Sequence, residues 1–405
     1  MQSRALHLFK AWFWSPPRPH GESIVDRRVS PLELLYDLVY AAVIAQAGLR
    51  LAEEVSARAV LDFALVFSLT WIAWTNGSLY LELHGRSNGR TRAYVFLQIG
   101  ILAILAIYAA DAGTTGGPGF AIAYAAFLAV MTWLWYDVRR QDVIARRPEF
   151  VLDAGRYVVA MAVSVALVLV SALLPEAARL VAWAVYVLGW AVLLSVLAGV
   201  GVGISRALVP TDSLVDRFGT FTLIVLGEVV FGVVDGLSRS RHDLETIATG
   251  MVALVVGFGF WWIYFDVVGG RFPKHEGRAL ANWILSHHPV TLSIAAAGAG
   301  MVSLLEHAHD AATPASTAWL LSGAVAVGLC FLVPNSRALA DAAARPAAFR
   351  PLGFALAAGA ALSLVIGWAR PAPWLLALLL VAVLGLVWAV AVRAFVTAGL
   401  WSAEA

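Results

Sequence analysis

The sequence predicts an all-α fold, that of a polytopic integral membrane protein with about twelve transmembrane helices arranged as two parallel six-helix repeats. Three observations lead to this prediction. Only 13% of the 405 residues are charged and 61% are hydrophobic, whereas a soluble domain carries about 25% charged residues. Apolar runs long enough to cross a bilayer fill nearly the whole chain. The basic residues gather in alternate loops, as they do on the cytoplasmic side of membrane proteins.

Each predicted helix is an apolar run bounded by charged residues or by glycine and proline, and none shows the period-two alternation of a strand. The first six runs cover residues 31–51, 58–82, 91–110, 119–137, 152–173 and 179–204. The next six cover residues 213–235, 243–268, 278–305, 315–333, 349–368 and 372–397. We therefore divide the chain into an N-terminal segment, 1–30, a first transmembrane half, 31–205, and a second half, 206–405.

The topology follows from where the 28 lysines and arginines fall, because most of them lie before the first span or after every second span. Both termini are therefore predicted to be cytoplasmic. The N-terminal segment lacks the apolar core and cleavage site of a signal peptide. Its aromatic cluster of Trp12, Phe13 and Trp14 beside Lys10 predicts an anchor at the membrane surface.

The composition also limits which partners and cofactors we predict. The net charge of +2 gives no indication of nucleic-acid binding, so the predicted partner is the lipid bilayer. The single cysteine, Cys330, excludes a disulfide framework and a cysteine-rich metal site. The sequence contains none of the common soluble catalytic signatures, and we predict no cofactor and no metal. Nothing in it sets an oligomeric state.

A weak internal repeat supports the division into halves. A tryptophan-rich span followed by a basic loop at 85–94 resembles a second tryptophan-rich span followed by a basic loop at 270–280. Acidic residues in the stretches 36–40 and 227–231 also correspond. Because each copy has six spans, the two copies would cross the membrane in the same direction. The alternative is a chance similarity between glycine- and arginine-rich loops.

Ionisable side chains inside predicted spans are the candidate functional residues, because a charge at the centre of a membrane helix costs at least about 2.5 to 3.5 kcal/mol. The candidates for proton coupling or substrate binding are Glu33, Asp37, Glu228, Asp266 and His288, with Asn76, Gln98, His287 and Glu306 as supporting residues. Glu33 and Asp37 share one helix face. Two such carboxylates repel when both are ionised, so one is expected to keep its proton near neutral pH. Alternatively, Glu33 pairs with Arg27 or Arg28 at headgroup level.

Depth counting suggests how these residues meet. Counted from the nearest basic flank at 1.5 Å per residue, Asp37, Glu228 and His288 all lie roughly 14 to 17 Å from the inner surface. They are therefore expected to converge near the middle of the bilayer. Asp266 is either a gate near the inner mouth or the partner of Arg271. Glu306 lies at the outer end of its span, where the neighbouring histidines lack the i, i+4 spacing of a metal site.

Four segments resemble the bacterial low temperature requirement protein A (LtrA) family. They are VSPLELLYDLVYAAVIAQ at 29–46, DRFGTFTLIVLGEVVFGVV at 216–234, WWIYFD at 261–266 and HHPVTLSIAAAGAGMVSLLEHA at 287–308. The resemblance implies a polytopic protein of the bacterial inner membrane. The family takes its name from growth in the cold, so the resemblance implies a location and not a reaction.

The resemblance also bears on the candidate residues. Glu33 and Asp37 match the acidic positions of the family's ELFFDL-like stretch, and Glu228 and Asp266 match those of its LGE and WWxYFD stretches. His288 and Glu306 fall where a later histidine and glutamate of the family occur, and the choice between His288 and His287 stays open. This sequence departs from the family in Tyr36 and Tyr40, where phenylalanines are usual.

These features predict a proton-coupled secondary transporter, or a permeation pathway, for a small solute or ion. In this prediction Asp37 and Glu228 bind protons or substrate, His288 relays protons, and Glu33 and Asp266 lie toward the inner gate. One alternative is a membrane-embedded enzyme in which the same carboxylates act on a lipid or isoprenoid as general acid and base. Another is a sensory or accessory protein whose carboxylates only hold helices together.

Overall fold

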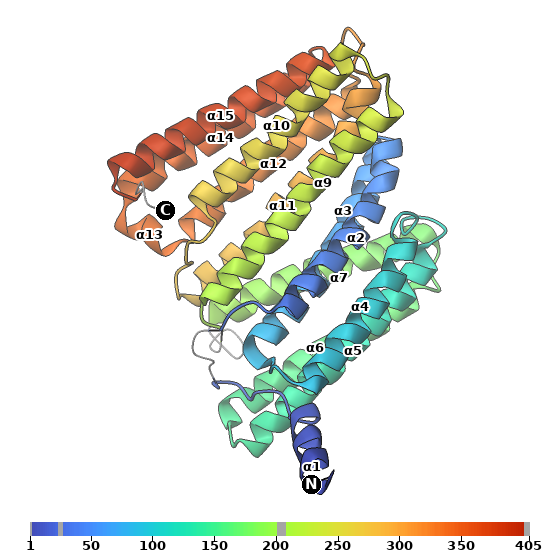
Figure 1. Ribbon diagram of the computed structural model, residues 1–405, viewed down its shortest axis with the longest axis vertical. Helices are drawn as coiled ribbons and strands as arrows, with labels where there is room; N and C mark the ends of the chain where they lie inside the picture. The colour runs from blue at the N-terminus through green and yellow to red at the C-terminus, as the bar shows by residue number, and fades with distance from the viewer. Residues whose placement is uncertain (1, 23–26, 201–207, 401–405) are drawn as a thin grey trace. The chain divides into compact units, whose positions relative to one another are not determined.

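The computed structural model describes residues 2–22, 27–200 and 208–400, and the regular elements in these ranges are all helices (Figure 1). Twelve of them are long and apolar enough to cross a membrane, which confirms the predicted class of fold. Their bounds are α2 Pro31–Glu53, α3 Ala57–His84, α4 Gly89–Ala109, α5 Gly117–Ile144, α6 Pro148–Ser171, α7 Glu176–Val200, α9 Asp212–Arg239, α10 Leu244–Val267, α11 Gly277–Glu306, α12 Ala315–Arg337, α14 Pro346–Ala369 and α15 Pro373–Thr397. Two shorter helices are α1, Gln2–Phe13, and α13, Ala340–Ala344.

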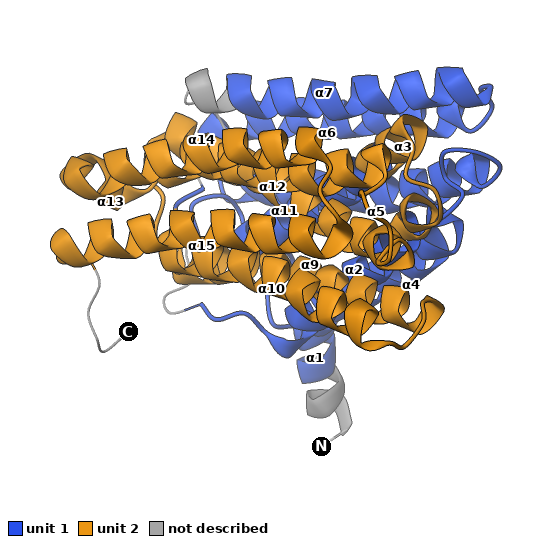
Figure 2. Ribbon diagram, turned by 90° about the horizontal axis from the view of Figure 1, so that it is seen from above, with its two compact units in different colours: residues 1–47, 65–209 blue, residues 48–64, 210–405 orange. Residues whose placement is uncertain are grey.

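The chain forms two compact units (Figure 2). Unit 1 comprises residues 1–47 and 65–209, and unit 2 comprises residues 48–64 and 210–405. The turn between α2 and α3 therefore belongs to unit 2, whereas most of both helices belongs to unit 1. The symmetry of the two predicted repeats stays a prediction.

In unit 1, α5 packs against α4 and α6, and α7 packs against α6. Local sequence features explain where some of these helices begin. The side chain of Asn88 caps α4 by accepting a hydrogen bond from the Thr91 amide at 2.9 Å, which satisfies one of the otherwise unpaired first-turn donors. Pro148 begins α6 at a position where a missing amide hydrogen costs nothing. The short helix α1 packs against α4.

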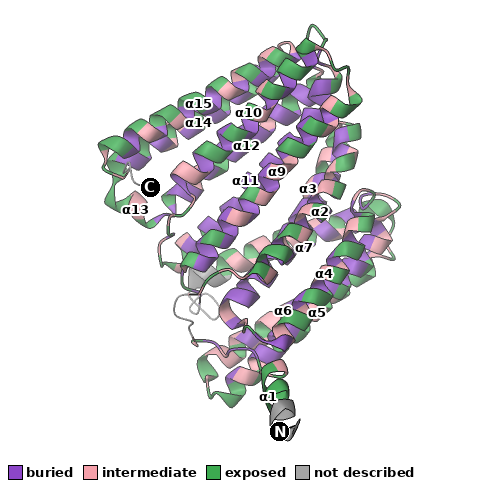
Figure 3. Ribbon diagram, in the orientation of Figure 1, coloured by how far each residue is buried: buried purple, intermediate pink, exposed green. Residues whose placement is uncertain are grey.

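In unit 2, α11 is the central helix and packs against both α9 and α12. Of its most apolar window, 83% is buried, compared with 39% for α15, and Figure 3 shows exposed residues along α15. The helix α14 packs between α12 and α15, and α15 also contacts α10. The side chains of Thr211 and Asp243 cap α9 and α10.

The tightest contact in unit 2 lies between two glycines, Gly232 on α9 and Gly298 on α11. A Cβ added to Gly232 would meet the Gly298 carbonyl carbon at 2.8 Å, and one added to Gly298 would meet the Glu228 carbonyl oxygen at 2.6 Å. Small residues allow such close approach of helix backbones in membrane proteins, where no hydrophobic effect drives helices together. The contact also fixes how α9 and α11 align along their lengths.

The predicted spans correspond one to one with the twelve long helices, and their ends differ by several residues in places. The largest difference is in α5, which continues to Ile144 instead of ending at Asp137. Asp137 is 7% exposed and forms an ion pair with Arg90 of α4. The helix therefore passes its first charged residue without leaving the protein interior, which apolar run lengths alone do not reveal.

We predict that Gly232→Ala destabilises the protein by about 2 kcal/mol, because the new methyl group would overlap the backbone of Gly298. Gly227→Ala on the same helix is the matched control, since a Cβ there meets no atom within 4 Å. Thermal unfolding of both purified variants in detergent measures the difference. Equal stability of the two variants would show that α9 and α11 do not approach each other in this way.

Candidate functional site

Asp37 lies on α2 within the core of unit 1 and is 0% exposed. Its Oδ1 accepts a hydrogen bond from the indole Nε1 of Trp74 on α3 at 2.8 Å. One residue before it, the hydroxyl of Tyr36 is 2.8 Å from that of Tyr40. The Tyr36 hydroxyl also lies against Gly77, where any Cβ would overlap it. The carboxylate and two phenols are thus enclosed at the contact between α2 and α3.

Asn76 and Gln98, the two neutral supporting residues, are also buried in unit 1. Asn76 accepts a hydrogen bond from Trp135 Nε1 at 2.8 Å, and its amide nitrogen lies 3.3 Å from Met161 Sδ. The Gln98 amide nitrogen lies 2.9 Å from Met131 Sδ. Methionine sulfur is a weak acceptor, so both amides donate to partners that satisfy them only in part.

Glu33 lies at one end of α2 in a buried ion-pair cluster. The Arg27 guanidinium contacts Glu33 Oε2 at 2.7 Å and Glu82 Oε2 of α3 at 2.5 Å. The side chains of all three residues are at most 11% exposed. The structure thus selects the alternative in which Glu33 pairs with Arg27, and this cation links the segment before α2 to the end of α3.

A neighbouring cluster, which the sequence did not suggest, joins the N-terminal segment to α3 and α5. The backbone amide and Nδ1 of His20 contact the two carboxylate oxygens of Asp142 at 2.9 and 2.8 Å. His84 Nδ1 donates to the Arg18 carbonyl at 2.8 Å, and Arg18 donates to the carbonyl of Glu82 at 2.7 Å. Burial is the main reason why the pKa of the Arg18 guanidinium is lowered. The cluster anchors the N-terminal segment against the helix ends.

In unit 2, His287 of α11 is the more enclosed of the two adjacent histidines. It is 1% exposed, whereas His288 is only partly buried. His287 Nδ1 lies 2.6 Å from the Trp283 carbonyl, which can only accept, so this nitrogen carries the hydrogen. The hydroxyl of Tyr264 then donates to His287 Nε2 at 2.9 Å. The amide nitrogen of Asn335 on α12 also donates to the Trp283 carbonyl, at 3.4 Å.

Glu228 lies on α9 and is partly buried, and it forms no hydrogen bond or ion pair with the described residues. Its backbone contacts Gly298, ten residues beyond His288 on α11. Phe218, ten residues before Glu228, meets His287 edge to face, with ring centroids 4.9 Å apart. Ten residues correspond to about 15 Å of helix, so Glu228 and His288 lie at different levels of unit 2.

The equal depth that we predicted for these two residues is therefore wrong. The count for Glu228 began at Arg217, taken as a residue at headgroup level, but the adjacent Phe218 lies against His287, nine residues beyond Arg278, where the count for His288 began. Asp37 belongs to unit 1 and Glu228 to unit 2. The convergence of these two carboxylates stays a prediction.

The remaining candidates lie near helix ends. Asp266 accepts a hydrogen bond from Trp388 Nε1 at 2.6 Å, and Arg271 pairs with Asp341 at 3.1 Å, so the alternative of an Asp266–Arg271 pair is wrong. Glu306 is exposed at the end of α11. Nearby, His309 contacts Asp243 at 2.8 Å. No group of three or more metal-binding side chains with suitable geometry occurs among the residues that the structure describes.

Together, the twelve long apolar helices and the carboxylates within them define a multi-pass helical membrane protein. The family model of the bacterial low temperature requirement A protein (LtrA) matches residues 28–398, nearly the whole chain. The chain therefore belongs to the LtrA family, a family of bacterial membrane proteins. No curated protein and no solved structure matches the chain.

We predict that Arg27→Ala destabilises the protein by about 3 kcal/mol or more, because it leaves the buried carboxylates of Glu33 and Glu82 without their shared cation. Arg28→Ala, at the exposed neighbouring residue, should change the unfolding free energy by less than about 0.5 kcal/mol. Denaturant or thermal unfolding in detergent compares the two variants. If both lose the same stability, the ion-pair cluster does not contribute as described.

Proposed function

We propose that this protein is a proton-coupled secondary transporter, or a permeation pathway, for a small solute or ion in the bacterial inner membrane. Asp37 and Glu228 are the residues that take up and release protons. The proposal includes the topology inferred from the arginine distribution, with both termini in the cytoplasm. The substrate is left as a small solute or ion, since nothing in the described residues selects one.

The observation that carries the proposal is the presence of carboxylates within membrane-spanning helices. Asp37 is fully buried on α2 beside a neutral indole donor, and Glu228 lies within α9 with no ion pair among the described residues. An ionised carboxylate in such surroundings loses its hydration, so the neutral, protonated form is favoured more than in water. Such residues commonly mark proton relays and ion pathways in membrane proteins.

The other acidic candidates support a structural role. Glu33 is held by Arg27, and Asp266 by Trp388. Both are near the ends of their helices, where they stabilise helix contacts beside the region in which an inner gate would lie. His288 and Glu228 lie at different levels of α9 and α11, so we do not assign His288 as a relay to Glu228.

The test is a measurement of protonation that needs no knowledge of the substrate. Infrared difference spectra of the protein in lipid, recorded between acidic and alkaline pH, should contain the carbonyl band of protonated carboxyl groups. Asp37→Asn and Glu228→Gln should each remove part of that band, and Glu306→Gln, which alters an exposed carboxylate, should leave the part from buried groups unchanged. Asn at residue 37 keeps an oxygen for the Trp74 hydrogen bond, so folding should persist.

The same variants are then compared in proteoliposomes that contain a pH-sensitive dye, with gradients of amino acids, organic acids, sugars and inorganic cations applied in turn. Proton movement driven by a solute in the wild type should fall to the level of empty vesicles in Asp37→Asn and Glu228→Gln. Wild-type proton movement in both variants would contradict the assignment of these carboxylates. An unchanged infrared band in both variants would contradict it independently.

A further inference from the structure

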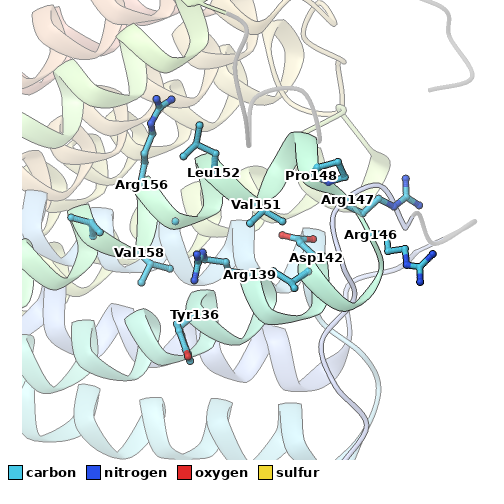
Figure 4. A pocket seen from close by; sticks show the side chains of 13 residues that line it. Tyr136, Arg139, Asp142, Arg146, Arg147, Pro148, Val151, Leu152, Arg156 and Val158 are labelled. Atoms are coloured by element: carbon cyan, nitrogen blue, oxygen red, sulfur yellow. The ribbon is translucent and has the colours of Figure 1, made fainter.

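A groove with a volume of about 1070 Å³ lies between the last turns of α5 and the first turns of α6 in unit 1 (Figure 4). Four of the residues that line it are arginines, Arg139, Arg146, Arg147 and Arg156, and most of the others are apolar. Figure 4 shows Arg139 and Asp142 between the two helices and Arg146 and Arg147 at the turn that joins them. Arg146 and Arg147 therefore lie at one end of the groove and Arg139 between the two helices, whereas Arg156 lies further along α6 and pairs with Asp153 at 3.2 Å.

Three of the arginines that line the groove have no carboxylate partner among the described residues. Arg139, Arg146 and Arg147 form no ion pair with the described residues, and the buried Nε of Arg139 has no acceptor among them. The one carboxylate that lines the groove, Asp142, accepts two hydrogen bonds from His20 instead. The groove thus holds an excess of positive charge that an anion can neutralise.

The backbone of the turn ends α5 and begins α6, so the positive charge of the groove comes from the arginine side chains. Arg147 is the N-cap residue of α6, and its side chain does not cap the helix. The first turn of α6 adds no anion-binding amides of its own, because Pro148 has no amide hydrogen, the Phe150 amide already donates to the Arg147 carbonyl at 3.0 Å, and the turn carries Glu149. Arg146 adopts a left-handed conformation, with φ of 54°, that ends α5: its amide donates to the Val143 carbonyl at 3.2 Å, and the Arg147 amide donates to the Asp142 carbonyl at 2.9 Å.

The apolar wall continues along the membrane-spanning parts of both helices. Val143, Leu152 and Val159 line the groove and are 56%, 63% and 63% exposed, respectively. Since α5 and α6 are both long enough to span a bilayer, the arginines at their joining turn lie where phospholipid headgroups lie. Basic residues at headgroup level beside exposed aliphatic side chains match an anionic phospholipid.

We propose that this groove binds an anionic phospholipid, with its phosphate at Arg139 and Arg147 and its acyl chains along Leu152 and Val159. The binding site belongs to unit 1 alone and does not depend on the proposed transport function. It is also separate from Asp37, so a lipid bound there would support the helix contact and would not occupy the site of proton exchange.

Native mass spectrometry of the detergent-purified full chain tests this proposal, with phosphatidylglycerol and phosphatidylcholine added in equal amounts. The wild type should retain phosphatidylglycerol preferentially. Arg139→Gln combined with Arg147→Gln should reduce its occupancy roughly tenfold or more, as expected for the loss of two cations at headgroup level. The control is Arg140→Gln combined with Arg92→Gln, which removes the same charge from exposed arginines outside the groove and should leave occupancy unchanged.

Two further measurements distinguish the binding of a lipid from the binding of a free phosphate. Leu152→Asn should weaken phosphatidylglycerol binding without any change in charge, and glycerol phosphate should fail to displace the lipid. Equal occupancy in the groove and control double variants would overturn the proposal. Displacement by glycerol phosphate at the concentration of the lipid would also overturn it, since the groove would then bind an anion alone. Unfolding temperatures measured without added lipid confirm that all variants are folded.

Discussion

The cost of placing charge in lipid governs the structure of this protein. The interior of a bilayer contains no water to solvate polar groups. Each carboxylate or guanidinium in a span is therefore neutralised, hydrogen-bonded or retained for a function. The chain meets this constraint in most places by pairing. Arg90 with Asp137, and Arg27 with Glu33 and Glu82, are ion pairs at helix ends whose members are largely buried.

The paired groups explain how the helices and the N-terminal segment are held. Arg27, Arg18 and His20 all lie before the first span, and each contacts the end of α3 or α5. Breaking such a buried pair costs more than its formation contributes, because the remaining charge stays buried. These residues therefore act as anchors, and their burial alone is no evidence of transport. Asp37 lies one helical turn beyond Glu33 on α2, and Glu228 lies in the middle of α9.

The spans could be predicted from the sequence, because the length of an apolar run is a local property that the thickness of the membrane imposes directly. The ion pair between Arg27 and Glu33 could also be predicted as an alternative, since the two residues are close in the chain. The sequence could not reveal that the same arginine reaches Glu82, or that His20 reaches Asp142, because these pairs are 55 and 122 residues apart. Depth counting failed at Arg217, because Arg217 and Arg278 were taken to lie at the same level although Phe218 lies against His287, nine residues beyond Arg278.

The central claim of the proposal is that carboxylates within the spans of this protein exchange protons with water. Cysteine accessibility tests it most directly, in a background in which Cys330, the only native cysteine, is replaced by serine. Glu228→Cys should react with a small hydrophilic thiol reagent in lipid, because only a hydrated thiol ionises readily. Phe231→Cys on the same helix, at a residue 68% exposed on the protein surface, should not react from within the lipid. If both cysteines are equally unreactive, residue 228 has no access to water, and the account of proton exchange is wrong.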